Sequence, residues 1–134
     1  VIPENAFERC LGLLEFTVPE GVTSIESYAF KDCYNLETVN LPDSLESIGS
    51  YAFAYGLKLT HINLPSGLTS IGEGAFKEAG LTSLILPDNL ETIGTKAFYY
   101  NRDLTTLSIG QNLSSVIRLS NIFASFPGKR PQIV

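Results

Sequence analysis

The stretch LPDSLESIGSYAF, residues 41–53, returns almost unchanged further along the chain. It reads LPSGLTSIGEGAF at residues 64–76 and LPDNLETIGTKAF at residues 86–98, so the spacings are 23 and 22 residues. Self-similarity with a fixed period in this range is typical of repeat proteins, in which each unit packs on its neighbours. The 134-residue chain is therefore interpreted first as an array of similar units.

The columns of the repeat predict two short extended segments in each unit. Apolar residues stand six, three and one positions before a proline, in the pattern Leu-x-x-apolar-x-apolar-Pro. The alternation in its second half predicts a strand with one buried face, which the proline ends because it lacks a ladder donor. Turn residues follow, then a second apolar pair, a glycine and an Ala-Phe pair. We expect a second short strand or extended stretch there, the glycine in a tight turn or close backbone approach, and one turn of 3₁₀- or α-helix around Ala-Phe.

One unit cannot bury its own apolar stripe, so a core forms only when units stack. Phe53 is then expected between Phe30 and Phe76. The fourth unit is one residue short between Phe76 and Leu81, which a loop should absorb. We expect a single domain with units at about 1–19, 20–42, 43–65, 66–87 and 88–110, and residues 111–134 as a degenerate last unit or C-terminal cap.

The columns Leu-x-x-Leu-x-Leu resemble leucine-rich repeats. With the added Pro, Ile-Gly and Ala-Phe positions, residues 1 to about 116 look like the BspA-like leucine-rich repeats of bacterial and protozoan surface proteins. The resemblance implies a leucine-rich-repeat solenoid, a right-handed β/α-type superhelix with a parallel β-sheet along one face. It also implies a secreted or cell-surface module for adhesion or protein recognition, without enzymatic activity. Its partner would be a protein, such as a host or extracellular-matrix protein, or a glycan.

Charge and hydropathy disfavour nucleic-acid binding and membrane insertion. The net charge of −5 disfavours nucleic acid as a partner, because phosphate binding needs clustered Lys and Arg. No apolar run reaches the roughly 20 residues of a membrane span, so we expect no membrane insertion by this chain. No signal peptide is visible and no Met occurs, which suggests a processed or excised piece without an N-terminal cap.

The residue types that carry chemistry are sparse, and we expect no catalytic, metal or cofactor site. Cys10 and Cys33 share a column with Gly56 and Ala79, which favours two buried free thiols over a disulfide, although stacked neighbours would be close enough for one. Two thiols and one distant histidine do not make a zinc site. His61 has Thr38 and Ser83 as neighbours across the ladder and no acid in its column, so a catalytic triad is disfavoured.

Tyrosines flank the Ala-Phe pair in several units. Tyr28 and Tyr51 precede it, and Tyr34, Tyr55, Tyr99 and Tyr100 follow it. They could form an interface or a carbohydrate platform. The favoured interpretation is that the rings cover the flank of the core, with their hydroxyls in water.

The outward positions of the first strand vary from unit to unit while the core columns stay fixed. This variation favours recognition through the outer sheet face over the alternative, a structural spacer that displays another domain, although free drift would also produce it. An exposed Ile85 points the same way, because a spacer has no use for it. The candidate ligand-binding residues are Thr38, Asn40, His61, Asn63, Ser83, Ile85, Thr106 and Ser108.

Overall fold

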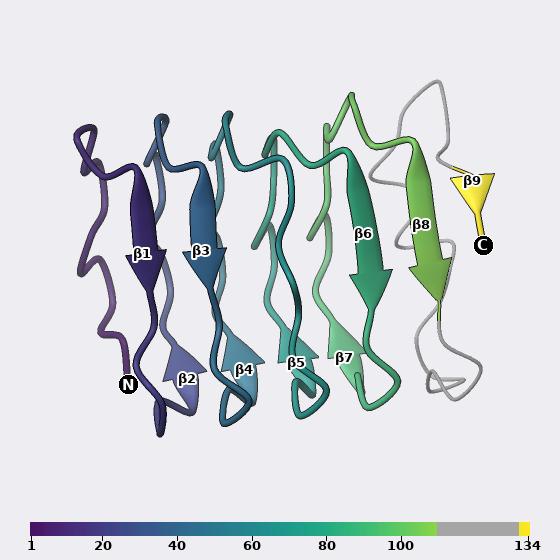
Figure 1. Cartoon of the computed structure of the whole chain (residues 1–134), viewed down its shortest axis with the longest axis horizontal. Coiled ribbons are helices and arrows are strands. Elements are labelled where there is room, and N and C mark those ends of the chain that lie inside the picture. Colours follow the sequence, from purple (N-terminus) through teal and green to yellow (C-terminus); the bar gives the residue numbers. More distant parts are fainter. Residues whose placement is uncertain (110–131) are drawn as a thin grey trace.

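The computed structural model describes residues 1–109 and 132–134, which form a solenoid of stacked layers (Figure 1). Each full layer runs down a front face, turns, and returns along a back face, and the layers wind in a right-handed sense. The front strands are β1 (Glu15–Thr17), β3 (Thr38–Asn40), β6 (Ser83–Leu86), β8 (Thr106–Ile109) and β9 (Gln132–Ile133). The back strands are β2 (Ser24–Ile25), β4 (Ser47–Ile48), β5 (Ser70–Ile71) and β7 (Thr92–Ile93).

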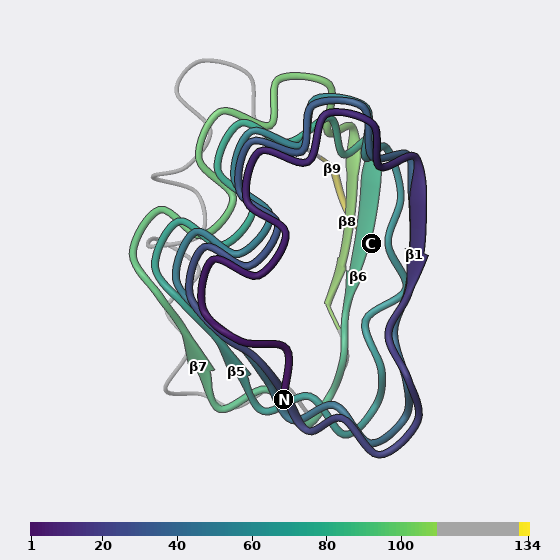
Figure 2. The ribbon, with the colours of Figure 1, turned by 90° about the vertical axis from the view of Figure 1, so that its left-hand side faces the viewer.

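The back strands form one continuous parallel sheet in the order β2-β4-β5-β7. Its register pairs Ile25 with Ile48, Ile48 with Ile71, and Ile71 with Ile93. The last pair keeps its column across the shortened fourth unit, so the missing residue is absorbed in a loop as predicted. Viewed along the solenoid axis, the back halves of successive layers follow one another, whereas on the front β6 and β8 are displaced from β1 (Figure 2).

A column of phenylalanines forms the centre of the core. Neighbouring rings from Phe7 to Phe98 stack with centroids 5.1–5.7 Å apart and planes within 13° of parallel. Phe53 is 1% exposed and lies between Phe30 and Phe76, which confirms the predicted register. Each ring therefore loses a packing partner if its neighbour is truncated.

The prediction of one helical turn around each Ala-Phe pair is wrong. Residues 26–33 instead form overlapping four-residue turns, closed by the bonds Ala29 N to Glu26 O (3.3 Å), Lys31 N to Tyr28 O (3.2 Å) and Cys33 N to Phe30 O (3.3 Å). Alternate amides bond to the next layer instead, as Phe30 N does to Ala52 O at 2.8 Å. The structure assigns no helix to any residue that it describes.

Left-handed residues explain why no helix forms. The residue two positions before each phenylalanine and the residue two positions after it have φ between 49° and 63° in every layer. Such a residue leaves the right-handed helical region, so a helix cannot continue through it. Nine of these ten residues are not glycine, namely Asn5, Arg9, Tyr28, Asp32, Tyr51, Tyr55, Glu78, Lys96 and Tyr100; the tenth is Gly74.

The Ile-Gly column allows the layers to approach closely, as predicted. A Cβ added to Gly72 would lie 2.7 Å from the carbonyl carbon of Gly49 in the layer below. A Cβ added to Gly94 would likewise lie 2.5 Å from the carbonyl carbon of Gly72. A side chain at either position would therefore push two layers apart.

The front face differs from the predicted continuous sheet. β1 pairs with β3, and β6 pairs with β8 and β9, but segment 60–64 between the two blocks is not a strand. Thr82 N donates to Thr60 O at 2.9 Å, and no other backbone hydrogen bond joins segment 60–64 to residues 36–41 or 81–86. Residues 111–131 of the expected last unit or cap lie outside the described residues, whereas β9 extends the front sheet beside β8.

Candidate recognition surface

The predicted binding residues lie on the outer face of the front strands. Ser83 pairs with Thr106 and Ile85 with Ser108, so β6 and β8 bring these four together. Thr38 and Asn40 lie on β3 beside Glu15 and Thr17 of β1. The side chains of Ser83, Thr106 and Ser108 are half-buried, and those of Thr38, Asn40, His61, Asn63 and Ile85 are exposed.

Ile85 is the most exposed large apolar side chain of the four front strands β1, β3, β6 and β8, at 64%. Its neighbours in the same strand, Leu84 and Leu86, are 2% and 1% exposed. The alternation therefore places Ile85 in solvent with no role in the core. The sequence-based prediction of its orientation is confirmed.

The break in the sheet separates the two halves of the predicted surface. His61 and Asn63 lie between them on segment 60–64, where their side chains hydrogen-bond to each other (Nε2 to Oδ1, 3.0 Å). Asn40 Nδ2 donates to Thr17 Oγ1 at 3.1 Å on the adjoining block. The surface is thus a row of polar side chains with one apolar residue, Ile85, in the second block.

One detail of the sequence prediction about His61 is wrong. Glu15 pairs with Thr38, so an acid does stand in the column that contains His61. Two layers of about 4.8 Å separate it from His61, which is too far for a hydrogen bond. The side-chain partner of His61 is Asn63, and no group of three or more His, Cys, Asp or Glu residues suited to a metal occurs in residues 1–109 and 132–134.

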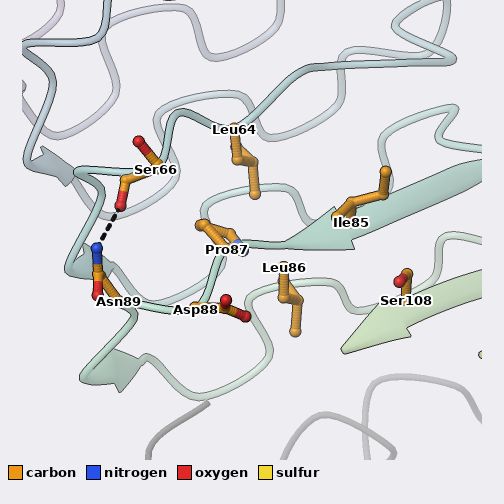
Figure 3. Close-up of a pocket in the computed structure, with 8 residues that line it drawn as sticks. All are labelled: Leu64, Ser66, Ile85, Leu86, Pro87, Asp88, Asn89 and Ser108. Atoms are coloured by element: carbon orange, nitrogen blue, oxygen red, sulfur yellow. Dashed lines mark hydrogen bonds between the residues drawn. The ribbon is translucent and has the colours of Figure 1, made fainter. Parts of the chain in front are cut away.

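A depression of about 460 Å³ adjoins the exposed face where β6 ends (Figure 3). Apolar groups of Leu64, Ile85, Leu86 and Pro87 line it, together with polar groups of Ser66, Asp88, Asn89 and Ser108. Asn89 Nδ2 donates to Ser66 O at 2.9 Å and ties the turns of two layers together. The sequence analysis named only Ile85 and Ser108 of these as binding residues; the signal for the others was the Pro-Asp-Asn turn that follows the strand.

The two cysteines are free thiols, as predicted, but the predicted burial is confirmed only for Cys33. Cys33 is buried, and its Sγ donates to Phe7 O at 3.0 Å, whereas Cys10 is half-buried. Burial raises the pKa of the Cys33 thiol to about 11, because a thiolate would lose its solvation there. Cys33 is therefore protonated and unreactive at neutral pH.

The tyrosines cover the flank formed by the Ala-Phe turns. Tyr28 and Tyr51 stack at 5.6 Å with planes 3° apart, and the Tyr51 hydroxyl donates to Glu73 Oε1 at 3.3 Å. Lys77 Nζ lies 5.6 Å from the Tyr55 ring centroid and 5.9 Å from that of Tyr99. A hydrogen bond with Tyr55 raises the pKa of Lys77. The rings thus contact one another and nearby cations, which agrees with the covering role favoured from the sequence.

These observations define a class: a parallel-sheet solenoid built from leucine-rich layers, with a fixed interior and a variable outer face. Residues 1–126 match the family described as BspA type Leucine rich repeat region, in six copies. The chain therefore belongs to the BspA-type leucine-rich repeat family.

Solved structures of similar proteins agree with this assignment. The chain superposes on a leucine-rich repeat protein of T. pallidum, TpLRR, with a TM-score of 0.77 and 31% identity, over 78% of this chain and 50% of that one. A leucine-rich repeat protein from Bacteroides ovatus gives a TM-score of 0.76 and 34% identity, over 78% and 27% of the two chains. The pneumococcal vaccine antigen PcpA gives a TM-score of 0.71 and 34% identity, over 75% of this chain and 25% of that one.

The chain thus spans half or less of the length of each of these three structures. The search of curated proteins found no match. In the part of the chain that the structure describes, no helix is long and apolar enough to cross a membrane.

Proposed function

We propose that this chain is a non-enzymatic protein-recognition or adhesion module of a secreted or cell-surface protein, and that it binds through the outer face of its front strands. The observation that carries the proposal is Ile85, which is 64% exposed in a strand whose other apolar residues are buried. Burying such a side chain against a partner is favourable, and the residues that dominate binding cluster near the centre of an interface. The residues around it vary between layers, whereas the core columns repeat.

The size of the face limits how tightly it can bind. Five layers at about 4.8 Å spacing and three or four strand residues of about 3.3 Å each give an area on the order of 300 Å². A standard protein interface uses about 800 Å² per partner. A partner must therefore also contact the turns after each proline or further repeats, and this chain alone should bind weakly.

The alternative is a structural spacer that displays another domain. The continuous back sheet and phenylalanine stack favour it, because they form a stiff rod whatever the front residues are. A spacer has no ligand of its own. The two functions differ in whether any partner depends on the front-face side chains.

A pair of double variants separates the two functions. Immobilised extracellular-matrix proteins and glycans would be tested by biolayer interferometry against the wild-type chain, the His61→Lys/Ile85→Lys variant, and the Thr23→Lys/Thr95→Lys variant. All four side chains are exposed, and each pair adds the same charge, but Thr23 and Thr95 lie away from the front face. We expect the front-face variant to lose binding by about tenfold or more and the control to retain it.

Equal binding by both variants would refute the front face as the recognition surface. If no probe binds the wild-type chain at any concentration tested, the spacer function is favoured. Circular dichroism of each variant establishes that the fold is retained.

A further inference from the structure

Charge is segregated over the surface of the solenoid. In residues 1–109, all six basic residues lie in the Ala-Phe turns and the loops that follow them: Arg9, Lys31, Lys58, Lys77, Lys96 and Arg102. The half of each unit that contains the front strand, the turn after the proline and the back strand has no Lys or Arg in this range. It has seven acids instead: Glu15, Glu20, Glu37, Asp43, Glu46, Asp88 and Glu91. The front face and its adjoining turns therefore have a negative potential.

The depression beside β6 lies within this acidic half. Leu64 and Pro87, both half-buried, supply an apolar surface, and the carboxylate of Asp88 lies at its border (Figure 3). Asp88 makes no ion pair with any residue that the structure describes. Asn89 uses its amide NH₂ to bond Ser66 O, which leaves its Oδ1 as a further acceptor. Acceptors thus border an apolar hollow, and within residues 1–109 and 132–134 no Lys or Arg forms an ion pair with Asp88.

Such a combination suits a lysine or arginine side chain. These side chains combine an apolar stem of methylene groups with a cationic head, so the stem can lie on apolar surface while the head remains at the polar rim. Arginine can also form two parallel hydrogen bonds to a single carboxylate. The volume of about 460 Å³ is at the lower end of the range for ligand pockets, roughly 300–1,000 Å³. One side chain projecting from a larger partner fits this space better than an enclosed cofactor does.

We propose that the depression at the end of β6 is a subsite for a basic side chain of the partner protein, with Asp88 as the residue that recognises the charge. This inference rests on the proposed function and specifies it: the partner presents Lys or Arg next to the surface that covers Ile85. It also identifies one turn after a proline that contributes the additional contact area the small front face requires.

The test uses short peptides with the ¹⁵N-labelled 134-residue chain. The probes are acetyl-Gly-X-Gly-amide with X as arginine, lysine, norleucine or glutamate, titrated while amide shifts are recorded. We expect shifts at the amides of residues 64, 66, 85, 86, 88, 89 and 108 with arginine, smaller ones with lysine, and none with norleucine or glutamate. Binding should weaken when salt is raised to about 1 M, because ions screen exposed charges.

Asp88→Asn tests the residue itself, since it removes the charge and keeps the shape. We expect about a twofold to fivefold loss of affinity for the arginine peptide, whereas Asp43→Asn, the same position two layers away, should leave it unchanged. An unchanged affinity of Asp88→Asn for the arginine peptide would overturn the subsite, and so would equal shifts with the norleucine peptide. An extracellular partner that His61→Lys/Ile85→Lys releases but Asp88→Asn does not would also overturn it, while leaving the proposed function intact.

Discussion

The back and front of the solenoid are built from the same repeat, yet only the back is continuous. The back strands keep one parallel register through four layers, from Ile25 to Ile93. On the front, the ladder stops at β3 and resumes at β6, with segment 60–64 outside it. Ile62 in that segment is nevertheless only 3% exposed, so the core continues beneath the break.

The difference shows which interactions hold the layers in register. Stacked phenylalanines, the glycine column and the amide bonds between turns all lie on the back and flank. Gly72 N, for example, donates to Ile48 O at 2.8 Å, and Phe53 N donates to Ala75 O at 2.8 Å. The front can lose a layer of hydrogen bonds without losing the stack, and its outer residues are therefore free to change.

The largest loss of stability is expected for a change in the phenylalanine column. Phe53→Ala removes a ring that stacks on two neighbours, and it should lower the free energy of unfolding by about 3–5 kcal/mol. Urea unfolding followed by circular dichroism measures this. A loss below about 1 kcal/mol would mean that the phenylalanine stack does not hold the layers together.

A methyl group at the glycine column is the next most costly change. The added Cβ in Gly72→Ala meets backbone atoms at 2.7 Å, and backbone cannot rotate away as a side chain would. We expect a loss near 3 kcal/mol, the upper end of the usual range for overpacking. Gly12→Ala is the matched control, because nothing lies within 4 Å of its added Cβ, and it should be neutral or slightly stabilising.

The free energy of unfolding should also decrease at alkaline pH because of the buried thiol of Cys33. The thiol pKa is raised from 9.0 to about 11 in the folded chain, so folding favours the protonated form. The resulting stability is complete below pH 9.0 and is lost as the pH rises to about 11, by at most roughly 2–3 kcal/mol. Other groups titrate in the same window, so the measured quantity is the difference between wild type and Cys33→Ala. If the two stability curves run parallel between these pH values, the buried thiol is not responsible.

The sequence was sufficient to predict whatever repeats. The parallel strands, the phenylalanine stack, the absorbed deletion and the free thiols all follow from columns that recur in each unit. The left-handed turns were missed because Tyr28 and Tyr51 have no local preference for positive φ; hydrogen bonds from the next layer impose it. The depression was missed for a related reason, since it forms between residues of three layers, and only the Pro-Asp-Asn turn of the middle layer gave a signal for it.

The interruption at segment 60–64 could not be predicted either. Its residues Thr60 to Leu64 fit the strand pattern as well as those of β3 do, so no residue type in the segment marks the break. The shortened fourth unit lies beside it, and an added Cβ at Gly80 would meet Leu57 O at 2.2 Å, so these two layers approach closely at the upper edge.

The smallest effect should come from the front residues of the interrupted layer. His61 and Asn63 are exposed and bond mainly to each other, so the double variant His61→Ala/Asn63→Ala should unfold within about 0.5 kcal/mol of wild type. Surface side chains without buried partners rarely contribute more, and neither residue belongs to a strand here. A loss of 1 kcal/mol or more would mean that this pair supports the break in the sheet and has a structural role. If the variant keeps its stability but loses partner binding, these two residues contribute to recognition and not to folding. Phe53 and Gly72 cannot be tested in this way, because changing either one destabilises the fold.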